Sequence, residues 1–116
     1  MRLLYWEQTD ESLVLLTLAG ETRAYEELVL RYERTVLSAA NGVLKNRFLA
    51  EDAAQDAFVT AWIKLNLLRE PSRFAPWVCR IAVNCAKHVA LQYSGYAELD
   101  SVENFLSSDD CDPLRG

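Results

Sequence analysis

Four polar side chains stand at helical spacing near the middle of this sequence, and their types suit recognition rather than catalysis. At 100° per residue they fall on one side of a helix, while an alanine-rich apolar stripe falls on another. They are Glu51, Asp52, Gln55 and Asp56. Carboxylates attract a basic partner, and a carboxamide adds directed hydrogen bonds. The helix dipole alone also explains first-turn acids such as Glu51 and Asp52, but it explains Gln55 and Asp56 less well.

A second group of residues mixes positive charge with aromatic rings. Such cations can hold phosphates, the rings can bracket an unstacked base, and a carboxamide can read its edge. The members are Arg69, Arg73, Phe74, Trp77, Arg80, Asn84 and Lys87. A tryptophan at the start of a helix is more often a core anchor, so both roles stay open for Trp77. Asn84 needs a reason to lie within a helix, because asparagine is a poor helix former.

Charge is distributed unevenly along the 116 residues. The net charge of −5 counts against nucleic-acid binding when it is taken alone. Residues 64–92, however, hold five bases and one acid, whereas residues 93–116 hold one base and six acids. A local basic field acts on a nearby phosphate, while more distant charges are screened over about 8 Å. Charge alone leaves both a nucleic-acid site and a solvated helix face open.

The cysteines and the single histidine do not form a pattern typical of catalysis or metal binding. Three cysteines without a CxxC pair argue against a disulfide framework and against a zinc finger. Cys85 and His88 share a helix face, but that spacing equally suits a buried thiol beside an imidazole. Cys85 lacks an orienting acid, and His88 has no serine at helical spacing before it. We expect no enzyme, no metal site and no cofactor.

The sequence has no segment of the kind that crosses or enters a membrane. Its longest apolar run, residues 13–19, is far shorter than the roughly 20 residues that span a bilayer. At the amino terminus, Glu7 comes too early for a secretory apolar region. We therefore expect a cytoplasmic protein without a membrane partner.

Apolar spacing predicts four helices that position these groups, and no segment alternates with the period of a strand. The predicted helices are a short one between Thr9 and Gly20, a long one from Thr22 to Val43, a third over Leu49 to Leu65, and a fourth to about Tyr93. We expect an all-α fold, a compact bundle of about four helices, over residues 1–95. Residues 96–116 are rich in acids and serine and are predicted to form a flexible linker.

Taken in order, these residues resemble region 2 of the sigma-70 superfamily, and within it the extracytoplasmic-function group of bacterial sigma factors. The resemblance covers about residues 10–92. It is carried by Gly20 to Ala24 with Tyr25, Leu28, Val29 and Tyr32, by Ala50-Glu51-Asp52 with Gln55-Asp56, Phe58, Ala61 and Trp62, and by Phe74, Trp77, Ile81-Ala82 and Asn84. Each motif is weak alone, but their combination in this order is specific.

The resemblance implies two partners. In the family, the helix that carries Glu51, Asp52, Gln55 and Asp56 docks on the clamp helices of the beta-prime subunit of RNA polymerase core. The loop from about Leu68 to Pro76 and the fourth helix resemble the element that opens the promoter at minus ten and captures a flipped base of the non-template strand. The DNA-binding residues implied are Arg69, Ser72, Arg73, Phe74, Trp77, Arg80, Asn84, Lys87 and His88. Binding of the single strand then supplies the energy for melting.

Two departures from the family pattern bear on this expectation. His88 stands where an acid is common, and Leu91 and Gln92 stand where arginines are common, which puts contacts to the upstream duplex in doubt. The helix-turn-helix of region 4 is absent, and Asp109 to Pro113 resembles the acidic linker that precedes it, so we expect a fragment of a longer factor. The alternative is a degenerate module that binds polymerase core or an anti-sigma protein without reading promoter DNA.

Overall fold

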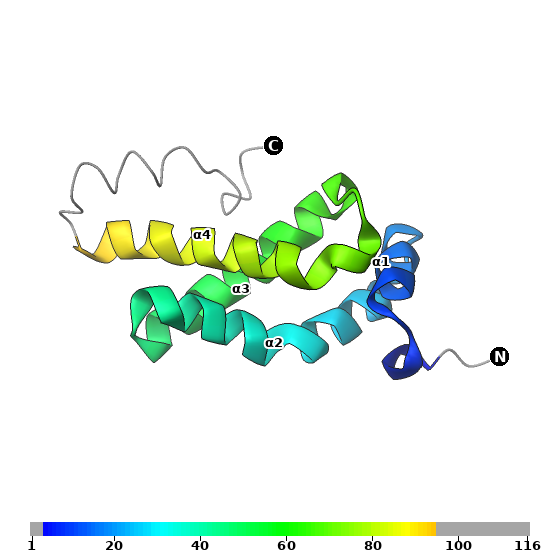
Figure 1. Cartoon of the computed structure of the whole chain (residues 1–116), viewed down its shortest axis with the longest axis horizontal. Helices are drawn as coiled ribbons and strands as arrows, with labels where there is room; N and C mark the ends of the chain where they lie inside the picture. The colour runs from blue at the N-terminus through cyan, green and yellow to red at the C-terminus, as the bar shows by residue number, and fades with distance from the viewer. Residues whose placement is uncertain (1–3, 95–116) are drawn as a thin grey trace.

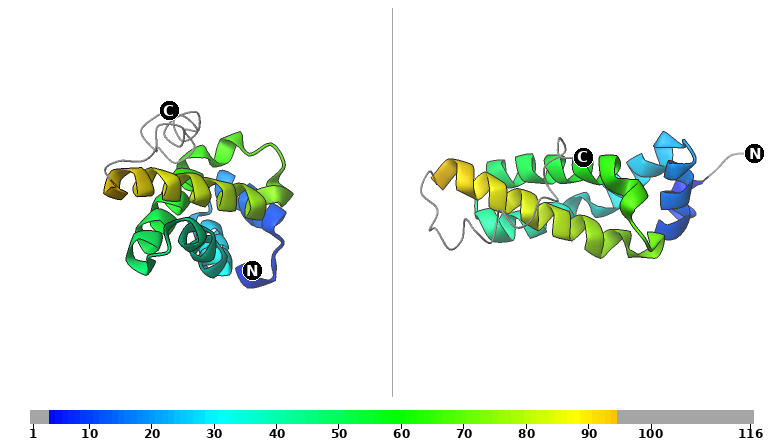
Figure 2. Two further views of the ribbon diagram at one scale, coloured as in Figure 1. Left: turned by 60° about the vertical axis from the view of Figure 1, so that its left-hand side comes forward. Right: turned by 90° about the horizontal axis from the view of Figure 1, so that it is seen from above.

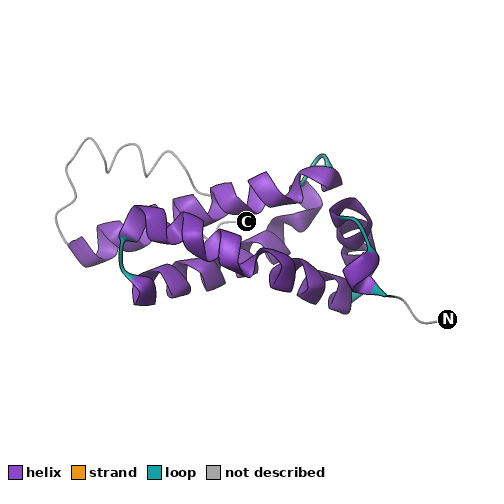
Figure 3. Ribbon diagram, turned by 60° about the horizontal axis from the view of Figure 1, so that its bottom comes forward, coloured by secondary structure: helices purple, strands orange, loops and turns teal. Residues whose placement is uncertain are grey.

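The structure, a computed structural model, describes residues 4–94, which are helical almost throughout (Figure 1). The predicted linker, residues 96–116, lies outside the described residues. Figure 3 shows only helices and short connections in the described part, so the all-α prediction is confirmed. The elements are the 3-10 turns η1 (Tyr5–Glu7), η2 (Leu65–Leu67) and η3 (Pro71–Arg73), and the helices α1 (Asp10–Leu18), α2 (Thr22–Leu44), α3 (Arg47–Lys64) and α4 (Phe74–Ser94).

Helix α1 begins and ends at the signals that the sequence carries for it. The side chain of Thr9 accepts a hydrogen bond of 3.1 Å from the amide of Ser12, which satisfies a free donor of the first turn. At the other end Gly20 has a φ of 108°, a conformation that costs a side-chain-bearing residue free energy. The chain therefore turns sharply into α2.

Helix α3 begins earlier than the third apolar stripe indicates. Lys45 adopts a left-handed φ of 53° after α2, and Asn46 then caps α3 by accepting a bond of 3.1 Å from the amide of Leu49. Glu51 and Asp52 consequently lie in the second turn, and the first turn contains no acid. The helix dipole acts mainly within the first turn, so it does not account for these two acids. The prediction that Glu51 and Asp52 are first-turn acids stabilised by the dipole is therefore wrong.

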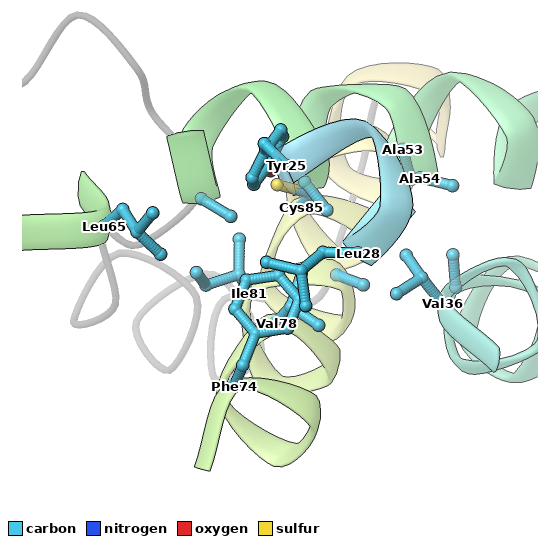
Figure 4. Packing of buried hydrophobic residues seen from close by; sticks show 14 of the residues in the cluster. Tyr25, Leu28, Val36, Ala53, Ala54, Leu65, Phe74, Val78, Ile81 and Cys85 are labelled. Carbon is cyan, nitrogen blue, oxygen red and sulfur yellow. The ribbon is translucent and has the colours of Figure 1, made fainter. Parts of the chain in front are cut away.

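The three long helices pack against one another, and α1 lies across one end of them (Figure 2). Alanines make this packing close, because Ala50, Ala53, Ala57 and Ala61 of α3 are all fully buried. Larger side chains from α2 and α4 fill the space between the helices, among them Leu28, Val36, Phe74 and Val78 (Figure 4). Burial of this apolar surface holds the bundle together.

Helix α1 also supports the connection between α3 and α4, since it packs against both α2 and η3. A polar cluster fixes it on α2: the Asp10 carboxylate accepts a bond of 2.9 Å from the Arg31 guanidinium and another from the Tyr32 hydroxyl. Burial and the bond to Asp10 raise the pKa of Tyr32 to about 12, so its hydroxyl remains a donor. The position of η3 thus depends on this cluster.

Candidate functional site

The four polar residues of α3 form an exposed surface, which we call the acidic face: Glu51, Asp52, Gln55 and Asp56. The sequence-based division of the helix is confirmed, because Ala53, Ala54 and Ala57 point into the core instead. The Glu51 carboxylate pairs with the Arg47 guanidinium at 3.3 Å, an exposed pair of small energetic value. Within residues 4–94 no cation pairs with Asp52 or Asp56.

The carboxylates of Asp52 and Asp56 lie one helical turn apart and repel each other. Partial burial and the charge of Asp52 both raise the pKa of Asp56. A cation placed between the two side chains would remove this repulsion and stabilise both charges. Within residues 4–94 the acidic face therefore lacks counter-charges for Asp52 and Asp56, and it suits a basic partner.

Apolar side chains extend the acidic face toward the end of α3. Val59 and Ile63 are 51% and 47% exposed, and Trp62 is also exposed while its ring meets that of Tyr25 edge-on at 5.0 Å. An apolar strip beside charged groups is the composition of a protein interface. Sequence reasoning missed Val59 and Ile63. Val59 follows Asp56 by three residues and Ile63 follows Val59 by four, so both lie on the same side of the helix as Asp56.

A hollow of about 530 Å³ lies where the α3–α4 connection meets the first turns of α4. Three arginines and one glutamate contribute to its wall together with the Trp77 ring, and we call it the arginine pocket. Its lining residues are Leu68, Arg69, Glu70, Arg73, Pro76, Trp77 and Arg80. Pro76 fits the first turn of α4, where its missing amide hydrogen has no helical partner. The structure thus brings together four residues that the sequence predicted to bind DNA.

Phe74 has a different place from the one predicted. Its side chain is fully buried, and its ring centroid lies 6.0 Å from that of Tyr32 and 6.4 Å from that of Tyr25. A ring in the core cannot stack on a ligand at the surface. Phe74 instead supports Trp77, whose ring centroid is 6.0 Å away and which is only half-buried. Phe74 is therefore a core residue and not part of the pocket wall.

The other predicted DNA-binding residues lie outside the pocket lining. Ser72 is exposed in η3 between two lining residues. Asn84 is only 8% exposed, and Lys87 and His88 are half-buried farther along α4, within about one turn of Asn84. Each of these three residues of α4 has an interaction partner within the structure. Asn84 is therefore nearly buried on α4 and is not among the residues that line the pocket.

Comparison with known families shows which family this chain belongs to. The family model of sigma-70 region 2 matches residues 28–94, which is more than half of the sequence. The chain belongs to the sigma-70 region 2 family. The matched segment runs from α2 to the end of α4, so both the acidic face and the arginine pocket fall within region 2. Helix α1, which packs against η3, precedes the matched segment.

Curated relatives place this region 2 in the extracytoplasmic-function, or ECF, type. The chain is 35% identical over 82 residues to the RNA polymerase sigma-H factor of Pseudomonas aeruginosa, covering 71% of this chain and 42% of that protein. It is 36% identical over 80 residues to the ECF RNA polymerase sigma-E factor of Escherichia coli K12, covering 69% and 41% respectively. The chain thus spans about two fifths of the length of these relatives. No solved structure matches it.

Residues 4–94 contain no cluster of three or more side chains able to hold a metal ion, and Cys85, near His88 in sequence, is buried. Burial also raises the pKa of the Cys79 thiol, which makes it a poor nucleophile. None of the helices in this part is long and apolar enough to cross a membrane.

Proposed function

We propose that this region 2 domain acts in transcription initiation, binding RNA polymerase core through the acidic face and opening promoter DNA through the arginine pocket. Family membership supports the first part of the proposal, since the relatives are named as RNA polymerase sigma factors. The two surfaces carry opposite charges and lie on different helices. One domain can therefore hold a basic protein and an acidic nucleic acid at the same time.

The proposed contact on polymerase core is the pair of clamp helices of the beta-prime subunit. Asp52 and Asp56 have no cation of their own within the described residues, so basic side chains of the partner neutralise them without displacing an existing ion pair. Gln55 adds directed hydrogen bonds, and Val59 and Ile63 give the interface an apolar part. The pKa of Asp56, which is raised in the free chain, is expected to fall on binding.

The proposed ligand of the arginine pocket is a base of the non-template strand flipped out at the minus-ten region. Arg69, Arg73 and Arg80 surround the hollow and suit phosphates, and Trp77 offers a ring for stacking. Stacking contributes about 1–3 kcal/mol per base in such sites, which offsets the cost of unstacking it from the duplex. Promoter opening in this proposal is driven by binding alone, without a catalytic residue or nucleotide cofactor.

One observation carries the proposal. In a chain whose net charge is −5, three arginines gather around a single partly exposed tryptophan in a hollow of about 530 Å³. Glu70 offsets only one of these charges, and a purely structural surface does not need the excess, because the arginines repel one another. A polyanion with an unstacked base satisfies both the charges and the ring.

Binding of a fluorescein-labelled single-stranded DNA to the full chain, measured by anisotropy, tests the pocket. Arg73→Ala is expected to weaken binding about 5- to 10-fold and to reduce the salt slope by about 0.7 to 1, because one phosphate contact is lost. Arg23→Ala removes an exposed arginine at the start of α2 and serves as the control with the same change of charge. Equal effects of the two substitutions would contradict a specific role for the pocket.

The burial of Asn84 favours a second candidate function, a module that binds polymerase core without reading promoter DNA. The carboxamide expected to read a base lies outside the pocket lining. Leu91 and Gln92 of α4 also replace the arginines expected from the resemblance. This candidate predicts that Gln55→Ala with Asp56→Ala weakens core binding while no single-stranded DNA binds. Loss of DNA binding in Trp77→Ala would exclude it.

We also propose boundaries for two parts of this chain. Residues 1–95 form the region 2 domain, and residues 96–116 are the linker toward a helix-turn-helix of the region 4 type. This assignment is supported by the match of residues 28–94 and by the change of composition after Gly95. Sequencing the reading frame beyond Gly116 tests it.

A further inference from the structure

The negative net charge of this chain resides entirely in its last 22 residues. Residues 1–94 contain eleven basic and eleven acidic side chains, so that part is formally neutral. Residues 95–116, which we call the acidic segment, contain one base and six acids. The acids are Glu98, Asp100, Glu103, Asp109, Asp110 and Asp112. The neutral part is itself polarised, since its uncompensated acids lie on α3 and its clustered arginines lie in the arginine pocket.

The acidic segment is attached to the helix that best complements it. Helix α4 contains no carboxylate, and it carries Arg80 near its start and Lys87 farther along. Its first turns form one wall of the arginine pocket, and its last residue, Ser94, precedes the acidic segment (Figure 1). The acidic segment thus follows the far end of the helix whose first turns carry the arginine pocket.

We propose that the acidic segment binds the arginine pocket of its own chain and excludes nucleic acid from it. The carboxylates of Asp109, Asp110 and Asp112 take the places of phosphates beside Arg69, Arg73 and Arg80. The identity of the excluded ligand rests on the function proposed above. The proposed contact between the segment and the pocket does not, because it is argued from charge and chain length.

Chain length matches the distance that the contact must span. Arg80 and Ser94 are separated by 14 helical residues, which is about 21 Å at 1.5 Å per residue. Asp109 follows Ser94 by 15 residues, and a linker of that length with the statistics of a random coil has a root-mean-square end-to-end distance of about 21 Å. Effective concentration is highest when these lengths agree, and for short linkers it reaches the millimolar range. Even weak ion pairs are then populated intramolecularly.

Neutralising the segment in the full chain tests the competition. The triple substitution Asp109→Asn, Asp110→Asn and Asp112→Asn is expected to tighten binding of a labelled single-stranded DNA about 3- to 10-fold at 50 mM salt. The gain is expected to shrink at about 200 mM salt, where the contact is screened. The matched control carries Glu7→Gln, Glu11→Gln and Glu26→Gln, exposed side chains whose loss changes the net charge equally. An equal gain in the control overturns the proposal.

A second measurement tests the contact without any nucleic acid. The indole N–H signal of Trp77 in the NMR spectrum of the full chain is expected to move between the parent and the Asp→Asn triple variant. The signals of Trp6 and Trp62, which lie outside the pocket lining, are expected to stay in place. An unchanged Trp77 signal overturns the proposal. If no form binds DNA while the Trp77 signal moves, the proposed function fails and the intramolecular contact stands.

Discussion

The ring of Trp77 lies against the ring of Phe74, with centroids 6.0 Å apart and planes inclined by 54°. Phe74 is fully buried between α2 and α4, whereas Trp77 forms part of the pocket wall. The two residues are three positions apart at the start of α4. Phe74 packs in the core, and Trp77 lines the pocket. The core therefore holds the pocket ring in place from behind, which limits its freedom before a ligand arrives.

We expect substitution of Phe74 to affect mainly the stability of the domain and substitution of Trp77 to affect mainly DNA binding. Phe74→Ala is expected to lower the free energy of unfolding by about 3–5 kcal/mol, because it leaves a cavity in the core. Trp77→Ala is expected to cost about half as much, since its ring is already partly in water. Urea denaturation measures both values, and DNA anisotropy then shows loss of binding in folded Trp77→Ala. A larger stability loss for Trp77→Ala would contradict this division.

Replacing Thr60 by valine is expected to stabilise the domain. Its side chain is fully buried in α3, and its hydroxyl has no hydrogen-bond partner within the described residues. An unsatisfied buried hydroxyl costs about 1–3 kcal/mol, so Thr60→Val is expected to raise the free energy of unfolding by about 1 kcal/mol. In a domain of this size that corresponds to a rise in Tm of about 4–8 °C.

Thr17 supplies the matched control for Thr60. It is also buried, but its hydroxyl donates a bond of 2.8 Å to the carbonyl of Leu13. Thr17→Val therefore removes a satisfied donor and is expected to leave Tm unchanged or lower it. Thermal unfolding followed by circular dichroism measures both variants, and the same sign for the two shifts would count against the assignment.

Two glycines predict opposite effects of the same substitution. Gly42 lies inside α2 with open space where an added methyl group would lie, so Gly42→Ala is expected to stabilise by about 0.5–1 kcal/mol. Gly20 has the same open space but a φ of 108°, so Gly20→Ala is expected to destabilise by about 1–2 kcal/mol through backbone strain alone. Denaturation midpoints measured side by side check the pair; stabilisation by Gly20→Ala would contradict the backbone argument.

Asp56 predicts a pH-dependent difference between the parent and Asp56→Asn. The pKa of Asp56 is higher in the folded chain than in the unfolded one. The free energy of unfolding therefore falls as pH rises through these two pKa values, because the folded state holds the proton more tightly. Asp56→Asn is therefore expected to raise Tm slightly at pH 7 and to have no effect near pH 3, where both states are largely protonated. A rise in Tm of equal size at both pH values would assign the effect to something other than charge.

Much of the fold could be predicted because its signals are local. Thr9 and Gly20 mark the two ends of α1 as expected, and the alanine stripe of α3 is buried as its spacing indicates. Helix α3 begins at Arg47, before the predicted start at Leu49, because Asn46 caps a first turn whose Phe48 is exposed and adds no apolar signal. Local patterns describe a helix well but not every terminus.

The candidate site could be predicted only in part. Periodicity assigns Phe74 and Trp77 to nearby positions of one helix, and only packing against Tyr25 and Tyr32 decides that Phe74 is the buried ring. The support of η3 by α1 depends on contacts between distant segments, such as the bond between Asp10 and Tyr32. Such contacts leave no periodic trace in a sequence, so the geometry of the pocket required the structure.

Three tryptophans can report whether α3 binds a protein and the arginine pocket binds DNA, as we propose. In NMR spectra of the full chain, a single-stranded DNA is expected to move the indole signal of Trp77, while a fragment with the polymerase clamp helices moves that of Trp62. Trp6, exposed in η1, is expected to respond to neither. Movement of Trp62 but not Trp77 on addition of DNA would contradict the account.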